Sequence, residues 1–230
     1  MTMLSINTNV GALNASQSSY SVNKSMETSM ARLSSGQRIN SADDDAAGLF
    51  LTQKIGAEIQ GLNQAVRNAA DGQALLMTTE GALDEVHTIL LRIRELAVQG
   101  SNETYDVMDR RALRAEIVDL QAEINRIADD TTWNGMGVIN GSISSGITFQ
   151  LGADNKQTMT VSVKGVSTVN LSLVTISHAG KKLTKATSLM VYISMVDKAI
   201  SVISSNRGKY AAAINRLDHA IANMQNIATN

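Results

Sequence analysis

The side chains best able to do chemistry are three histidines and a run of three aspartates, and neither set has the spacing of a metal or catalytic site. His87, His178 and His219 are far apart, and none belongs to an HxxxH or HExxH arrangement. The aspartates at 43–45 are consecutive, so they do not converge on one ion as the alternating ligands of a calcium loop do. We interpret them as a cap for a helix that begins near Ala46, because negative charge favours a helix N-terminus.

Other catalytic signatures are missing from the sequence as well. It has no cysteine, which excludes thiolate nucleophiles, disulfides and sulfur-ligated metals. It also has no GxGxxG, GxxxxGK[ST] or GxSxG motif, so the local geometry for nucleotide binding or an elbow serine is not encoded. We therefore expect a protein without cofactor or metal that is not an enzyme.

One segment carries the residue types of a protein–protein contact. In LRIRELAVQ at 91–99, Ile93 continues an apolar stripe, whereas Arg92 and Leu96 point elsewhere. An arginine beside an exposed leucine is a combination that interfaces favour. The segment predicts a partner-binding patch that includes Arg92 and Leu96.

The bulk composition predicts long helices and excludes several classes of partner. With 20 Lys and Arg against 21 Asp and Glu, the chain lacks the basic field that nucleic-acid binding requires. Proline is absent and aromatic residues make up only 3%, so helices can run without a break and pack through aliphatic side chains. The longest apolar run covers only 189–193, so we expect no membrane insertion. Residues 1–10 have neither the basic nor the apolar region of a signal peptide, so we expect no cleaved signal.

Apolar residues recur at alternating steps of three and four, which is the spacing of a helix that buries one narrow stripe. The pattern predicts helices over 46–100, 104–130 and 188–229, with a first buried stripe that starts at Leu51 and Ile55. The last helix has the cleanest stripe, which only Arg207 interrupts: Leu189, Ile193, Val196, Ile200, Ile203, Tyr210, Ile214, Leu217, Ile221, Met224 and Ala228. We predict a mainly α fold, an elongated bundle of long antiparallel coiled-coil-like helices with a small β-hairpin region.

The hairpin region is expected within 138–186. Ile147, Phe149 and Leu151 alternate with polar residues, and Met159 and Val161 do so again after a GADNK turn. We expect this hairpin to cap one end of the bundle. The stretch 166–185 is rich in serine and threonine and predicts a loop or a weak extra strand.

An amphipathic helix is also predicted at the N-terminus, over about residues 4–34, and Gly36 provides its C-terminal stop. Its apolar stripe, which includes Ile6, Val10, Leu13, Met26 and Leu33, has no obvious partner within the chain.

The motifs together resemble bacterial flagellin over nearly the whole chain. They are INTNVGALNA at 6–15, LSSGQRINSADDDAAGL at 33–49, GLNQAVRNAADGQALLMTTEGALDEV at 61–86, LRIRELAVQ at 91–99, QAEINRIADDTTWNG at 121–135, FQLGADNKQTMTV at 149–161 and NRLDHAIANMQN at 215–226. Only about 166–185 lacks a clear counterpart.

The resemblance implies a division of the chain by position in a flagellar filament. Residues 1–45 would be the inner-tube helix and linker, and residues 46–230 the rod-like core domain. In the family the inner helix pairs with a helix at the extreme C-terminus, and this sequence ends at Asn230, where that segment would begin. We therefore expect the C-terminal inner-tube segment and the large outer variable domains to be lacking.

The resemblance also implies a function and partners. The leading hypothesis is a secreted, extracellular structural subunit that self-assembles into the helical propeller of the bacterial flagellum. The alternatives are a flagellin-like cell-surface binding protein and a hook–filament junction protein. Implied partners are other flagellin subunits, the flagellar export machinery, cap and junction proteins, and the Toll-like innate receptor for flagellin. The receptor-binding face would carry Arg92, Leu96 and Glu116, and Leu91 stands where receptor-activating members have a glutamine.

Overall fold

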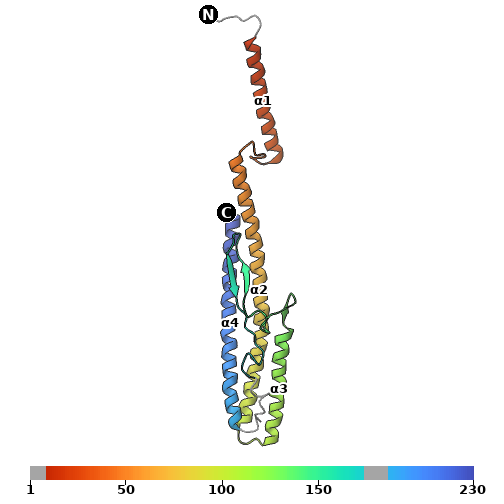
Figure 1. Cartoon of the computed structure of the whole chain (residues 1–230), viewed down its shortest axis with the longest axis vertical. Coiled ribbons are helices and arrows are strands. Elements are labelled where there is room, and N and C mark those ends of the chain that lie inside the picture. Colours follow the sequence, from red (N-terminus) through yellow and green to blue (C-terminus); the bar gives the residue numbers. More distant parts are fainter. Residues whose placement is uncertain (1–8, 174–185) are drawn as a thin grey trace. The chain divides into compact units, whose positions relative to one another are not determined.

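The computed structural model describes residues 9–173 and 186–230, and this part of the chain is mainly helical, as predicted (Figure 1). Its helices are α1 (Val10–Ser35), α2 (Ala46–Ser101), α3 (Val107–Asp130) and α4 (Ala186–Thr229). Two short antiparallel strand pairs follow α3. The chain divides into two compact units, Met1–Glu58 and Ile59–Asn230.

A heptad seam between α2 and α4 organises the second unit. Most buried residues of α2 advance by steps of three and four, which is the coiled-coil spacing. These seam residues are Leu62, Ala65, Ala69, Gly72, Leu76, Thr79, Leu83, Val86, Leu90, Ile93, Ala97 and Gly100. Leu75 and Leu96 are buried beside the seam. The two helices are antiparallel, because Glu80 and Arg94 of α2 pair with Arg207 and Asp197 of α4 in reverse order.

Every second residue of the stripe predicted for α4 is buried, as Leu189, Val196 and Leu217 show. The isoleucines between them, such as Ile193 and Ile200, are only half-buried. The seam positions between the buried residues are instead occupied by Tyr192, Ala199, Asn206 and Ala213. Small side chains let two helices approach closely, so the seam takes alanine while the larger isoleucines cover its edge. A stripe chosen by bulk alone misses this.

Helix α3 packs against α2 and α4 as a third, shorter helix, with Ile117, Gln121, Ile124 and Ala128 buried. Asp106 caps its N-terminus and forms a reciprocal capping box with Asp109. Gln121 donates a hydrogen bond of 3.0 Å from Nε2 to the hydroxyl of Tyr192 on α4. This bond satisfies a polar group inside the core.

The predicted hairpin is present and consists of β3 (Ile147–Gln150) and β4 (Thr158–Val161), with Phe149 opposite Met159. It does not cap an end of the bundle. It lies beside α2, where Asn68 Nδ2 donates to the carbonyl oxygen of Gln150 (Figure 1). A Cβ atom at Gly72 would lie 3.1 Å from the Phe149 ring, so glycine permits this close approach.

The length of α3 explains the placement of the hairpin. At 1.5 Å per residue, α3 spans about 36 Å and α4 about 66 Å, so α3 cannot cover the whole helix pair. Beyond the end of α3, the hairpin replaces it as the third element that packs on α2 and α4. A smaller pair, β1 (Thr132–Trp133) and β2 (Met136–Gly137), makes the transition through Asn134 and Gly135, which both have positive φ as a tight hairpin turn requires.

The stretch after β4 is a loop where it is described. Val166, Leu171 and Leu173 are buried in the core, and Asn125 of α3 accepts hydrogen bonds from the backbone N–H and hydroxyl of Thr168. The remainder of the predicted loop or strand, and His178 with it, lies outside the described residues.

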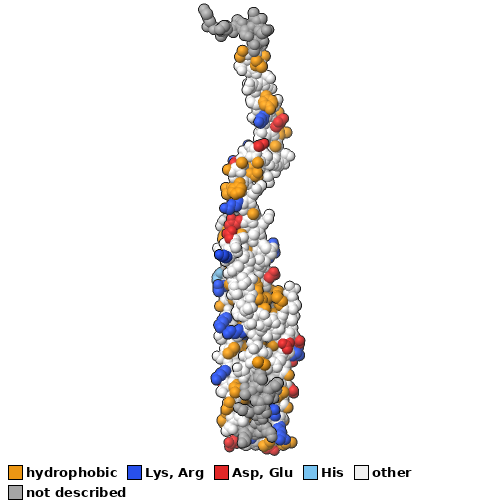
Figure 2. Space-filling model, viewed as in Figure 1, with side chains coloured by type: hydrophobic (Ala, Val, Ile, Leu, Met, Phe, Trp, Pro, Cys, Tyr) orange, Lys and Arg blue, Asp and Glu red, His pale blue; other side chains and the backbone are white. Residues whose placement is uncertain are grey.

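In the first unit, α1 contains no buried residue. Apolar side chains from Val10 to Leu33 are exposed along the helix, as the unpartnered stripe predicted, although Ile6 lies outside the described residues (Figure 2). Leu51 and Ile55 of α2 are exposed too, so the prediction that they begin the buried stripe is wrong. Burial along α2 begins only at Leu62.

The connection from α1 to α2 is fixed by its own polar groups. Gly36 ends α1 in the left-handed region, with φ of 68°. Asp45 Oδ1 accepts a hydrogen bond from the backbone N–H of Gly48, so the predicted acidic cap of α2 is confirmed at this residue. Asp44 Oδ2 accepts from the backbone N–H groups of Asn40 and Ser41, and its carboxylate lies 3.8 Å from Arg32.

Over residues 187–229, α4 is long and apolar enough by composition to cross a membrane, with a mean hydropathy of 1.3 in its most apolar window. A core helix of a folded bundle has the same composition. The seam residues of α4 are buried against the bundle, and Arg207 and Asp197 form ion pairs with α2. In this structure α4 is therefore held in the bundle through its seam residues and these two ion pairs.

Truncation of the seam should destabilise the second unit strongly. Leu217 is fully buried, so Leu217→Ala should lower the free energy of unfolding by about 2–5 kcal/mol. Lys209→Ala, on the exposed side of the same helix, should change it by less than about 0.5 kcal/mol. Chemical denaturation of both variants measures the difference, and equal stabilities would show that the seam is not buried in solution.

The turn around Asp44 should loosen in acid. Backbone hydrogen bonds from Asn40 and Ser41 hold the pKa of Asp44 below its usual 3.8, with Arg32 adding to the effect. Because the folded pKa is lowered, the stabilisation is complete above pH 3.8 and is lost as pH falls through the folded value. An NMR titration should give a pKa below 3.8 for this carboxyl, with shifts of the Asn40 and Ser41 amides. A normal pKa with static amides would contradict the geometry.

Candidate partner-binding surface

The structure brings together two of the three predicted contact residues, Arg92 and Glu116. Arg92 lies on α2 and Glu116 on α3, and the antiparallel arrangement of these helices places the two side chains on one face. Arg92 Nη2 lies 2.9 Å from Glu116 Oε1, and its Nη1 lies 2.6 Å from Glu95 Oε2. One guanidinium therefore bridges a neighbouring turn of its own helix and the next helix.

The electrostatics of this triad favour a fixed arginine on an open surface. Hydrogen bonds to Glu116 and then to Glu95 raise the pKa of Arg92 above its usual value. About half of the side-chain surface of Arg92 and of Glu116 remains exposed. The arrangement can present a guanidinium flanked by two carboxylates to a partner, and it holds no nucleophile or acid–base pair.

Leu96 does not belong to that surface. It was predicted to be exposed beside Arg92, but it is only 1% exposed and lies in the hydrophobic core. The prediction considered a single seam, whereas α2 packs here against both α3 and α4. Leu96 immediately precedes the seam residue Ala97, so α2 buries a second apolar side chain at this level. Leu96 therefore packs in the core on the helix that carries Arg92 and is not accessible to a partner.

A second polar contact lies on the α4 side of α2. Arg94 Nε lies 2.7 Å from Asp197 Oδ1, and both side chains are about half exposed. The same helix face carries Leu91 and Val98, which are exposed. Asp197 was not foreseen as a partner, because only the register between two helices distant in sequence places it opposite Arg94.

Arg207, which interrupts the predicted stripe of α4, forms a clamp across the seam. Its guanidinium lies 2.8 Å from Glu80 and 2.8 Å from Asp84, two carboxylates one turn apart on α2. All of these groups are partly exposed, so their value lies in fixing the register of the helices more than in stability. A lone arginine in an apolar stripe is the sequence signal that could have indicated such a clamp.

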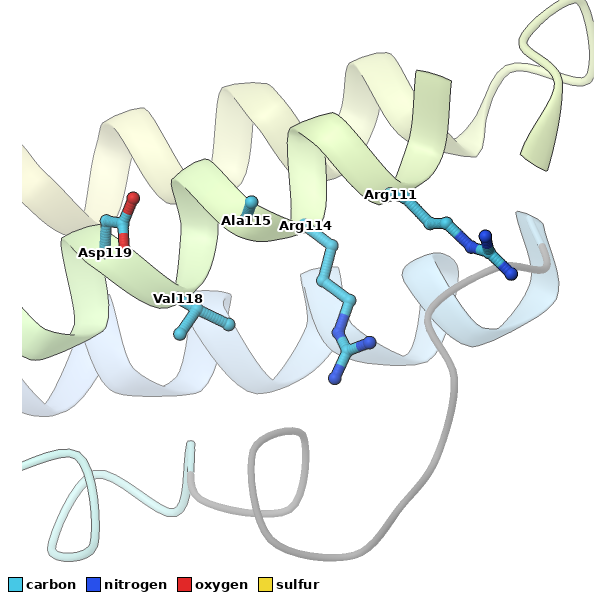
Figure 3. Close-up of a pocket in the computed structure, with 5 residues that line it drawn as sticks. All are labelled: Arg111, Arg114, Ala115, Val118 and Asp119. Atoms are coloured by element: carbon cyan, nitrogen blue, oxygen red, sulfur yellow. The ribbon is translucent and has the colours of Figure 1, made fainter. Parts of the chain in front are cut away.

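A shallow pocket of about 290 Å³ lies on α3, lined by Arg111, Arg114, Ala115, Val118 and Asp119 (Figure 3). Arg111 and Arg114 extend from the same side of the helix, so the pocket is cationic. Within 9–173 and 186–230, no cluster of histidine, cysteine and carboxylate side chains has the geometry to hold a metal ion. His87 is half-buried and His219 exposed, in different parts of the bundle.

The burial of Leu96 predicts a large difference between two leucines of one helix. Leu96→Ala should reduce the free energy of unfolding by about 2–5 kcal/mol because it leaves a cavity. Leu91→Ala is the matched control: this side chain is 46% exposed and should cost less than about 1 kcal/mol. Thermal or urea unfolding decides the matter, and a larger loss for Leu91→Ala would reverse the assignment of the two faces.

Comparison with known sequences identifies relatives over the whole chain. Residues 6–144 match the family model described as the bacterial flagellin N-terminal helical region. The flagellin of Halalkalibacterium halodurans is 40% identical over 225 residues, which are 98% of this chain and 81% of that protein. The B-type flagellin of Pseudomonas aeruginosa is 42% identical over 164 residues, which are 71% of this chain and 33% of that longer protein.

Comparison with solved structures agrees. The crystal structure of flagellin from Bacillus cereus has a TM-score of 0.60 and 32% sequence identity, and the match covers 69% of this chain and 88% of that one. A protein from Vibrio parahaemolyticus assigned as flagellar hook-associated has a TM-score of 0.64 over 81% of this chain and 95% of its own, at 15% identity. The second likeness concerns the fold alone.

Proposed function

This chain belongs to the bacterial flagellin family and is a structural subunit of the extracellular flagellar filament, and we propose that it enters the filament through the uncovered apolar side chains of α1. The observation that carries the proposal is the contrast between the two units. The second unit has a core of its own, whereas no residue of α1 is buried.

The exposed apolar side chains of α1 favour assembly, because they can be buried only against another chain. Most helices in proteins gain their stability from packing an apolar face rather than from intrinsic propensity. Met26, Met30 and Leu33 are each more than half exposed in the single chain. We propose that the α1 helices of neighbouring copies of this chain cover these apolar side chains in the filament.

The division of roles follows from this contrast. We assign residues 1–45 to the inner tube of the filament and residues 46–230 to the rod-like core domain. Two observations support the assignment. No residue of α1 is buried within the single chain, whereas the seam residues of α2 are buried without another chain. The rod would then be folded before assembly, and the inner helix would gain its packing on joining the filament.

Further partners are proposed from family membership. They are the flagellar export machinery, through which the chain would leave the cell, and the cap and junction proteins at the two ends of the filament.

The assembly proposal is tested by two isosteric substitutions on α1. Met26→Gln with Met30→Gln keeps side-chain length and helix propensity but replaces apolar surface with polar surface. The test uses bacterial cells that make the flagellar export machinery but lack their own flagellin. In these cells the unmodified chain should give filaments by electron microscopy. The double variant should give soluble chain in the medium and no filaments.

The control for this experiment is Lys24→Gln, an exposed position on the other side of α1. It should leave filament formation unchanged. Filaments of normal length from the double variant would refute the role of α1 in assembly.

We also propose that Arg92 and Glu116 form part of a contact surface for the Toll-like innate receptor, with Leu96 as buried support. Their direct contact and half-exposed side chains favour this surface. Arg92→Ala and Glu116→Ala should each weaken receptor binding by monomeric protein by about fivefold or more, as loss of an interface anchor does. Arg126→Ala, an exposed arginine elsewhere on α3 that also pairs with two carboxylates, is the control and should bind normally. Unchanged binding in both test variants would remove the receptor from this face.

A further inference from the structure

A polar cleft between two loops and α4 has no role in the assembly and receptor proposals. Its volume is about 720 Å³, which is within the range of small-molecule sites. The polar and apolar side chains that line it come from the loop after β2, the loop after β4 and the middle of α4: Asn140, Ser144, Lys164, Asn170, Val202 and Asn206.

Hydrogen bonds hold the walls of the cleft in place. The backbone N–H of Val166 donates to the carbonyl oxygen of Ile139 at 2.9 Å, which joins the two loops. The backbone N–H of Lys164 donates to the hydroxyl of Tyr210 at 3.2 Å, which joins the second loop to α4. The cleft is therefore preformed, and a ligand would not have to order its walls.

The chemistry of the lining selects an anion rich in oxygen atoms. Lys164 is the one ionisable residue of the lining, and its side chain forms no ion pair with any described residue. Three asparagine amides and the hydroxyl of Ser144 add hydrogen-bonding groups, and the lining has no carboxylate and no aromatic ring. An aromatic ligand would find no ring to stack on, whereas a carboxylate with nearby hydroxyls would find a cation and amides.

Asn206 is the residue that packing alone does not explain. It occupies a seam position of α4, is 4% exposed, and its Nδ2 finds no hydrogen-bond acceptor among the described residues. A buried amide left unpaired lowers stability, and an aliphatic residue would suit this seam position better. Rotation of the amide about χ2 exchanges Nδ2 and Oδ1, so the side chain can turn a donor toward the cleft that it lines.

We propose that this cleft binds small hydroxycarboxylates, with the carboxylate at the Lys164 amine and the hydroxyls at the asparagine amides. The proposal does not depend on filament assembly. Lys164 is exposed and Asn206 is buried, so such a ligand would lie with its charged end toward solvent.

Gluconate and sorbitol provide a matched pair of probes, because they share a chain of hydroxyls and differ in one terminal carboxylate. In ¹H–¹⁵N NMR spectra of the 230-residue chain, gluconate should shift the side-chain amides of Asn140, Asn170 and Asn206 saturably. Sorbitol should shift them much less. Equal responses to the two probes, or shifts that do not saturate, would overturn the proposal.

Two variants separate binding from structure. Lys164→Met should weaken gluconate binding by about tenfold or more, because a charge-assisted hydrogen bond is lost. Lys209→Met removes the same charge from an exposed site on α4 and should bind as the unmodified chain does. Asn206→Leu should abolish the response while raising Tm, since it removes an unpaired buried amide. Binding that survives both Lys164→Met and Asn206→Leu would disprove the site.

The same spectra test the main alternative, which is an acidic side chain of another protein. Triglutamate supplies carboxylates on a peptide backbone without the hydroxyls. Saturable binding of triglutamate together with no response to gluconate would overturn the proposal in favour of a protein partner. Preference for gluconate over triglutamate supports it.

Discussion

The packing of α2 against α4 through one heptad seam is the interaction on which the rest of the chain depends. Because the seam fixes the register of two long helices, it determines where every other element can lie. Helix α3 and the β3–β4 hairpin together cover the length of this pair, and each buries its apolar side chains against it. Polar residues beside the seam, notably Arg207 with Glu80 and Asp84, fix the register of the two helices, which apolar contacts alone leave loosely specified.

Much of this fold could be predicted from the sequence, because a heptad pattern and a polar–apolar alternation are local signals. The long helices, the hairpin over 147–161 and the acidic cap at Asp45 all follow from such signals. The meeting of Arg92 with Glu116 was accessible as well, since a short loop between antiparallel helices restricts the geometry.

The remaining features depend on how many neighbours each helix has, and a single sequence does not encode that number locally. Leu96 is buried because α2 has two helical partners at this level, and Ala199 lies in the seam in place of Ile200 because close packing favours a small side chain. The position of the hairpin depends on the difference in length between α3 and α4. Asn206 shows the same limit, since its unpaired amide becomes visible only when its surroundings are known.

A filament subunit with this construction keeps its rod folded at all times and gains the packing of α1 only on assembly. Hydrogen–deuterium exchange on free chain and on filaments tests this claim most directly. We expect fast exchange across α1 in the free chain, strong protection of the same amides in filaments, and protection of residues 62–100 in both states. Unchanged exchange of α1 on assembly, or a rod that becomes protected only in the filament, would contradict the account.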